Sequence, residues 1–307
     1  MVDVVDLKKS YGNFVALNGV SFHISEGEMY GFVGPNGAGK TTTMKIMAGL
    51  LAADGGSVEI DGVDILRHPK KVKQLVGYMP DFFGVYDNLK VSEYMEFFAS
   101  VYGIYGKEAR KRCQEKLDVV HLLEKEDSFV DVLSRGQKQR LCLARCLLYQ
   151  PKILVMDEPA FGLDPRARYE MKEVLRELMD DGVTMLVSSH ILSELSEICT
   201  TVGIIEAGKM VVSGTLDGIM TKVNQSNPIV MEVVDGLEKV IAFLKQKEDV
   251  ETISTNEQKV YVGFRGSQKD EALLLQGLLG QGVLISQYGR AENNLESLFM
   301  QITEKEE

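Results

Sequence analysis

Apolar and polar residues alternate along the first two thirds of the chain in two distinct patterns. Short runs rich in β-branched residues, bounded by turns, alternate with segments whose apolar residues recur every three or four positions. Strands followed by helices in this way predict an α/β domain with a mostly parallel sheet, over about residues 1–220. The clearest strands are predicted at residues 28–33, 152–156, 184–188 and 202–206.

One segment inside this domain departs from the alternation. Between about residues 82 and 150 the apolar spacing predicts amphipathic helices, which indicates a helical subdomain inserted into the sheet domain. Within it, Tyr94, Phe98 and Val101 are expected to belong to the core because their spacing places them on one helix face.

The last third of the chain has fewer and shorter elements. After a polar linker at about residues 221–228, short strands and helices are predicted, ending with a helix at residues 295–302. Residues 228–307 are therefore expected to form a small α+β domain, separate from the first.

Composition excludes several classes of protein. The 307 residues carry 34 Lys and Arg against 45 Asp and Glu, a net charge of −11 that would repel nucleic acid as a main partner. The four cysteines lack the C-x-x-C spacing, which favours buried thiols in a reducing cytoplasm. A charged N-terminus predicts no signal peptide, and no run approaches the roughly 20 apolar residues that a membrane span needs.

A glycine-rich motif indicates nucleotide binding. Residues 34–41 match G-x-x-x-x-G-K-[ST] between an apolar strand and a helix-like run. Glycines let backbone N–H groups surround a phosphate, Lys40 reaches the terminal phosphates and the Thr41 hydroxyl can ligate Mg²⁺. A simple turn with a buried lysine would not require Lys-Thr at these two positions. The predicted contacts are Gly34, Pro35, Asn36, Gly37, Ala38, Gly39, Lys40, Thr41 and Thr42.

Two carboxylates follow the predicted strand at residues 152–156. Successive strand residues point to opposite faces, so Asp157 and Glu158 are expected to have different roles. Asp157 is assigned to Mg²⁺, and Glu158 to the γ-phosphate, where it would orient or deprotonate the attacking water. Two solvated acids at a strand end are the alternative, which is weak for a pair on a buried strand downstream of the glycine-rich motif.

A third motif identifies a family. Residues 133–137 read Leu-Ser-Arg-Gly-Gln, and by themselves Ser134 and Gln137 predict a capping box that begins a helix. Together with the glycine-rich motif they closely resemble the signature of the ATP-binding-cassette (ABC) ATPases, over residues 1 to about 214. The resemblance implies a P-loop NTPase fold with a helical subdomain, ATP and Mg²⁺ as cofactors, and ATP hydrolysis.

The same resemblance implies roles for further residues. Tyr11, 23 residues before Gly34, matches the aromatic that stacks on adenine. His190 matches the switch histidine that contacts the γ-phosphate, and residues 162–164 match the D-loop, with Asp164 also capping a helix. In this family Ser134, Gly136 and Gln137 would face the γ-phosphate held by a second subunit, so that ATP joins a homodimer.

Two positions depart from the family pattern. Arg135 stands where a glycine is usual, so it either adds a cation near the incoming phosphate or points outward without a catalytic role. Asp81 stands where the Q-loop usually has glutamine. A carboxylate there can ligate Mg²⁺ but loses the amide donor and adds repulsion, which predicts lowered or differently coupled hydrolysis.

The resemblance further implies the ATP-binding subunit of an exporter, peripheral on the inner face of the cell membrane and bound to a separate transmembrane permease. Residues 82–105 concentrate eight aromatics, a density that suits a groove for a permease helix. Residues 295–299 resemble the extension of drug- and antibiotic-exporter ATPases, with an expected role in homodimerisation or its regulation. The alternatives are a soluble ABC-fold ATPase acting on DNA or ribosomes, and a nucleotide-sensing regulator with impaired hydrolysis. The eight aromatics are Phe82, Phe83, Tyr86, Tyr94, Phe97, Phe98, Tyr102 and Tyr105, with some of the first three expected to be exposed.

Overall fold

Two units, Met1–Leu216 and Asp217–Glu307, make up the chain in this computed structural model. Each unit has its own cluster of buried apolar side chains. The structure describes residues 1–81, 84, 88–191, 195–216, 218–219, 228–256 and 258–290.

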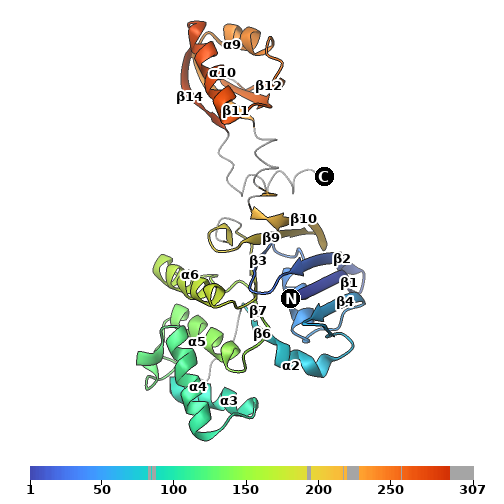
Figure 1. Ribbon diagram of the computed structural model, residues 1–307, viewed down its shortest axis with the longest axis vertical. Coiled ribbons are helices and arrows are strands. Elements are labelled where there is room, and N and C mark those ends of the chain that lie inside the picture. The colour runs from blue at the N-terminus through green and yellow to red at the C-terminus, as the bar shows by residue number, and fades with distance from the viewer. Residues whose placement is uncertain are drawn as a thin grey trace. The chain divides into compact units, whose positions relative to one another are not determined.

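The central sheet of the first unit has six strands in the order β10-β9-β3-β8-β7-β6 (Figure 1). β3 (Met29–Val33), β7 (Ile153–Met156) and β8 (Met185–Ser189) are buried at every residue, as expected for apolar strands covered on both faces. All pairs among β9, β3, β8, β7 and β6 are parallel, so the predicted α/β fold with a mostly parallel sheet is confirmed. The other strands are β6 (Val76–Met79), β9 (Thr201–Glu206) and the antiparallel edge strand β10 (Lys209–Thr215).

A second, antiparallel sheet, which the sequence pattern did not reveal, accompanies the first in the order β2-β1-β4-β5. Its inner residues, such as Val4, Leu7 and Val20, share one core with Tyr30 of β3 and Met44 of helix α1 (Lys40–Met47). Helix α1 therefore packs in the core that the two sheets share. The strands are β1 (Val2–Tyr11), β2 (Phe14–Ile24), β4 (Gly55–Ile60) and β5 (Val63–Asp64).

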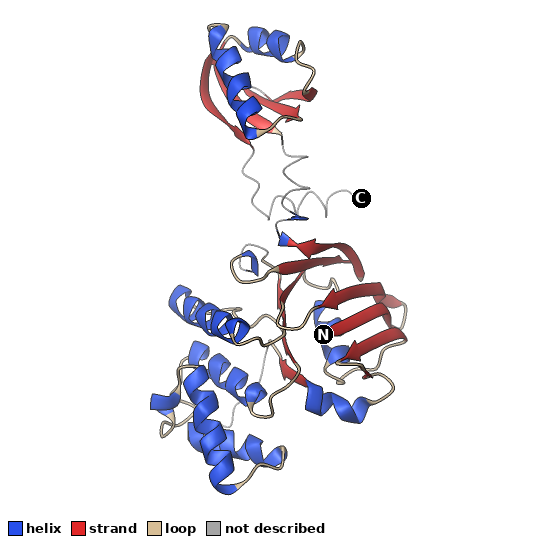
Figure 2. Cartoon of the chain, viewed as in Figure 1, coloured by secondary structure: helices blue, strands red, loops and turns tan. Residues whose placement is uncertain are grey.

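Helices gather at one end of the first unit, as Figure 2 shows in blue. They are α3 (Val91–Val101), α4 (Gly106–Val119), η2 (Leu123–Lys125) and α5 (Arg135–Leu147), with α6 (Pro165–Asp180) beside α5. The short η1 (Pro69–Lys71) and α2 (Val72–Leu75) precede β6 and lie apart from this group (Figure 1).

One core prediction in these helices is wrong. Tyr94 is fully buried and Phe98 is half-buried, but the side chain of Val101 is 65% exposed. Val101 is the last residue of α3 and lies one turn beyond Phe97, which is also exposed. Helical spacing fixes the face on which a residue lies, but not how far along the helix its packing partners extend.

The second unit has the order β11-α9-β12-β13-α10-β14, a split β-α-β arrangement. Its antiparallel sheet runs β12-β13-β11-β14, and Val240 of α9 and Leu278 of α10 pack on one face with Met231 of β11. The predicted α+β composition is confirmed. Residues 221–227 of the predicted linker and the predicted helix at 295–302 lie outside the described residues. The elements are β11 (Ile229–Asp235), α9 (Leu237–Leu244), β12 (Val250–Asn256), β13 (Lys259–Phe264), α10 (Gln268–Gly280) and β14 (Leu284–Arg290).

Candidate functional site

The glycine-rich loop joins the end of β3 to the start of α1. A Cβ at Gly34 would lie 2.3 Å from the Ile205 carbonyl oxygen, so only glycine fits there. Gly39 has φ +111° and is the N-cap of α1, without a side chain to bond the first-turn N–H groups. An uncapped helix N-terminus behind a glycine-rich turn is a site for a phosphate group.

Lys40 is held inside this loop. Its side chain is 5% exposed, and its ammonium donates to the carbonyl oxygens of Gly34 (2.6 Å) and Pro35 (3.2 Å). Burial lowers the pKa of Lys40, while the charges of Glu158 and Asp157 oppose that shift. The Lys40 Nζ lies 3.8 Å from Oε1 of Glu158, so the ammonium lies beside this carboxylate.

Asp157 follows β7 and carries an unpaired oxygen. It is 1% exposed, its Oδ1 accepts a hydrogen bond from Ser188 Oγ (2.7 Å), and its buried Oδ2 has no hydrogen-bond partner among the described residues. A buried carboxylate oxygen without a donor suits a cation. The described residues include no cluster of three or more His, Cys, Asp and Glu that could hold a metal. Mg²⁺ at a phosphate site needs only one or two protein ligands, so Asp157 and the Thr41 hydroxyl fit this ion.

Glu158 and His190 form a hydrogen-bonded pair. The His190 Nδ1 lies 3.0 Å from the Glu158 Oε2, and the Glu158 N–H donates to Ser188 Oγ (3.0 Å). Neighbouring parallel strands β7 and β8 end at the same edge of the sheet, which brings these residues together from positions 30 to 32 apart in sequence. Glu158 has φ +49°, a conformation that turns its side chain away from the regular strand direction.

A cavity of about 390 Å³ collects most of the predicted site residues. Its walls also include Phe14, across the β1–β2 turn from Tyr11, and Phe161, whose ring meets the His190 ring edge-on at 5.7 Å. Neither phenylalanine was predicted, and no local sequence signal marks them. The predicted residues in the lining are Tyr11, Pro35, Asn36, Gly37, Gly39, Lys40, Thr41, Thr42, Asp81, Asp157, Glu158 and His190.

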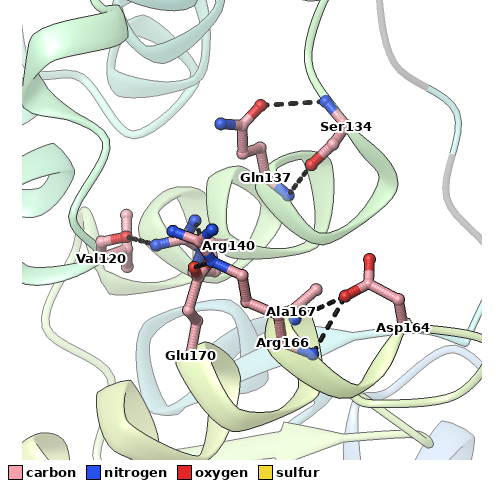
Figure 3. Close-up of polar contacts among 8 residues, drawn as sticks. All are labelled: Val120, Ser134, Gln137, Arg140, Asp164, Arg166, Ala167 and Glu170. Atoms are coloured by element: carbon pink, nitrogen blue, oxygen red, sulfur yellow. Dashed lines mark hydrogen bonds and ion pairs between the residues drawn. The ribbon is translucent and has the colours of Figure 1, made fainter.

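The remaining predicted residues lie elsewhere. Gly34 and Ala38 belong to the loop but do not line the cavity, and Ser134, Gly136 and Gln137 begin α5, also outside its lining. Ser134 and Gln137 form the predicted capping box, with Gln137 N–H donating to Ser134 Oγ (3.2 Å) and Ser134 N–H to Gln137 Oε1 (2.9 Å) (Figure 3). The cavity and the start of α5 are therefore two separate surfaces of the chain.

Asp81 adds negative charge to the cavity that Asp157 also lines. Burial raises the pKa of the nearby Tyr78 hydroxyl, and the charges of Asp157 and Asp81 raise it further.

We expect Asp81→Gln to remove the negative charge of Asp81 and supply an amide donor, raising ATP turnover about three- to tenfold, on the order of 1 kcal/mol in the barrier. Phosphate release with and without the expected membrane subunit measures this. Asp180→Asn, an exposed acid at the end of α6, is the control, and an unchanged rate and stimulation in Asp81→Gln would contradict the prediction.

Comparison with known proteins assigns this chain to a family. The sequence profile of the ABC transporter family matches residues 17–161. Over 307 aligned residues the chain is 31% identical to the linearmycin resistance ATP-binding protein LnrL of Bacillus subtilis, covering 99% of this chain and 98% of LnrL. The chain belongs to the ABC transporter family.

Other relatives agree with this assignment. Nod factor export ATP-binding protein I of Ralstonia nicotianae is 31% identical over 310 residues, covering 100% of this chain and 94% of that protein. A solved dimer of the ATP-binding cassette MJ0796, in a post-hydrolysis state bound to ADP and Pi, superposes with a TM-score of 0.63. It is 27% identical and covers 70% of this chain and 99% of that one. The first unit of this ABC protein is an ATP-binding cassette, and its enzymatic activity is ATP hydrolysis. Across the described part of the chain, no helix combines the length and apolar character that a bilayer crossing requires.

Proposed function

We propose that this ABC ATPase powers export through a separate transmembrane permease, working as a homodimer at the inner, cytoplasmic face of the cell membrane. The separation of the cavity from the start of α5 is the observation that carries the proposal. The cavity holds Lys40, Asp157 and Glu158, whereas Ser134 and Gln137 begin α5 outside it. Two chains facing each other would complete two sites, each with the cavity of one chain and the α5 N-terminus of the other.

In such a site the chain's own residues divide the work. Tyr11 stacks on adenine, the loop N–H groups and Lys40 bind the terminal phosphates, and Glu158 accepts the proton of the attacking water. The hydrogen bond from His190 holds the Glu158 carboxylate in place. Mg²⁺, held by Asp157 and Thr41, would neutralise charge on the phosphates when bound.

Two relatives that align with this chain over nearly their whole length have names that support the export direction. One is a linearmycin resistance protein and the other a Nod factor export protein. A nucleotide-sensing regulator remains a second candidate function because Asp81 lies in the cavity lining in place of the usual glutamine. Turnover by the purified chain that rises when its membrane subunit is added supports the exporter. No turnover, with the membrane subunit present, would favour the regulator.

An exposed apolar stripe on the helical segment suits a permease helix. Phe97 and Val101 lie one turn apart on α3, and Tyr105, 68% exposed, follows at the start of α4. Adjacent exposed apolar side chains of this kind mark a protein contact, here with one helix of the membrane subunit. Phe82, Phe83 and Tyr86, assigned to the same groove from the sequence, lie outside the described residues.

The stripe gives a direct test of docking. We expect Val101→Glu with Tyr105→Glu to reduce co-purification of the membrane subunit at least tenfold, because two buried charges would oppose the contact. ATP turnover without the membrane subunit should stay at the wild-type rate. Val211→Glu, an exposed valine on β10, is the matched control. Undiminished co-purification of the double variant would rule out this surface.

A further inference from the structure

The side chain of Arg135, the first residue of α5, packs against the loop that precedes α6 in the same chain. A Cβ at Gly162 would lie 2.6 Å from the Nη1 of Arg135 and 2.7 Å from its Cζ and Nη2. Three atoms of one guanidinium at nearly equal distances mean that its flat face covers Gly162. Gly162 has φ +68°, so glycine serves there both for its backbone conformation and for the room it leaves.

The contact is one of packing. The Arg135 side chain forms no hydrogen bond or ion pair with any other residue that the structure describes, although it is a cation at the protein surface. A planar guanidinium can stack on a peptide in a way that the ammonium of lysine cannot. Charge and shape at this position can therefore be separated by substitution.

Two more contacts join the start of α5 to the start of α6. A Cβ at Gly136 would lie 2.7 Å from the Ala167 Cβ, so the two helices approach closely there. Further along, the guanidinium of Arg140 donates to Glu170 Oε2 (3.0 Å) and to the Val120 carbonyl oxygen (3.2 Å) (Figure 3). Because Arg140 is buried, this pair resists separation, and the two helix starts form one block.

The loop under Arg135 leads to the catalytic pair. Phe161 precedes Gly162, lines the ATP cavity and contacts the His190 ring, whose Nδ1 bonds the Glu158 carboxylate. The contacts therefore run from Arg135 through Gly162 and Phe161 to His190. One end of this series begins α5, and the other end lies in the cavity of the same chain.

We propose that Arg135 is a positioning residue that couples the two ATP sites of the dimer. The inference rests on the proposed function, in which the α5 N-terminus of one chain meets the ATP held in its partner's cavity. Binding there fixes the start of α5, and the stacked guanidinium fixes the loop at Gly162 with it. The Phe161 ring then holds His190 and Glu158 in place in the first chain's own cavity.

Steady-state phosphate release by the full chain, as a function of ATP concentration, tests this coupling. The wild type should show a Hill coefficient approaching about two, the number of sites, and Arg135→Gly should lower it toward about one. Arg135→Lys keeps the charge but loses the flat stacking surface, so it should behave like the glycine variant. A wild-type coefficient in Arg135→Lys would show that charge matters rather than packing, and would overturn the inference.

A variant of Phe161 tests whether the coupling passes through this residue. Phe161→Ala should lower the Hill coefficient as Arg135→Gly does, and the double variant should lower it no further, because both changes interrupt one series of contacts. Additive losses would overturn the inference. Formation of an ATP-dependent dimer by Glu158→Gln distinguishes a failure of the coupling from a failure of the proposed function. If that dimer does not form, the proposed function fails; if it forms while Arg135→Gly keeps the wild-type Hill coefficient, only the coupling fails.

Discussion

Glu158→Gln is expected to lower ATP turnover by about two to four orders of magnitude, the usual contribution of a general base. The amide has the size of the carboxylate and can still contact His190, but it cannot accept a proton from water. It also removes a negative charge that lies 3.8 Å from the Lys40 ammonium and faces the phosphates. ATP should therefore bind at least as tightly, and the dimer that it joins should persist because hydrolysis no longer separates the subunits.

Two measurements check this expectation. Phosphate release gives the turnover, and size-exclusion chromatography with and without ATP gives the dimer. Glu177→Gln is the control, since Glu177 is exposed on α6 and pairs only at the surface with His121 (3.3 Å). A turnover rate of Glu158→Gln within a factor of two of the wild-type rate would show that Glu158 is not the general base.

Lys40→Ala should weaken ATP binding about tenfold to a hundredfold. A hydrogen bond to a charged group contributes about 1.5–3 kcal/mol, and each 1.4 kcal/mol changes the affinity tenfold. The loss has a second cause, because Lys40 is the cation nearest Glu158 and Asp157 in this cavity. Without it, the two carboxylates would repel the triphosphate. Titration calorimetry with ATP measures the change in affinity.

The same helix provides the control for Lys40. Lys45 lies in the last turn of α1 and is exposed, so Lys45→Ala should bind ATP like the wild type. Thermal unfolding without nucleotide establishes whether each variant is folded. ATP that raises the melting temperature of Lys40→Ala as much as that of the wild type would contradict the assignment.

Several parts of the site follow from short stretches of sequence. Residues 34–41 form a glycine-rich turn before a helix because the glycines permit the backbone conformation, with Gly39 at φ +111°. Ser134 and Gln137 cap α5 with hydrogen bonds that span three residues. Asp164 likewise caps α6 by accepting from the N–H groups of Arg166 and Ala167, both at 3.0 Å. Each of these features depends on neighbours in the chain, which the sequence shows directly.

Other features depend on residues far apart in sequence. Phe14 enters the cavity from the start of β2 and Phe161 from the loop before α6, with no pattern around either that marks a binding residue. Periodicity places Val101 on the core face of α3, yet its position at the helix end leaves it exposed. The antiparallel sheet of β1, β2 and β4 pairs residues as far apart in sequence as Val2 and Ile60, so its order is decided by packing.

The sequence by itself determined the local features of this ABC protein: a glycine-rich loop before a helix, two acids after a buried strand and a capped helix. These depend on backbone conformation and hydrogen bonds within a few residues, so a short motif is enough to specify them. Only the tertiary structure decided which loop receives the Arg135 side chain, and that Phe161 stands between that loop and His190. Such contacts join separate helices and strands, and their geometry exists only after the core has set the distances between them.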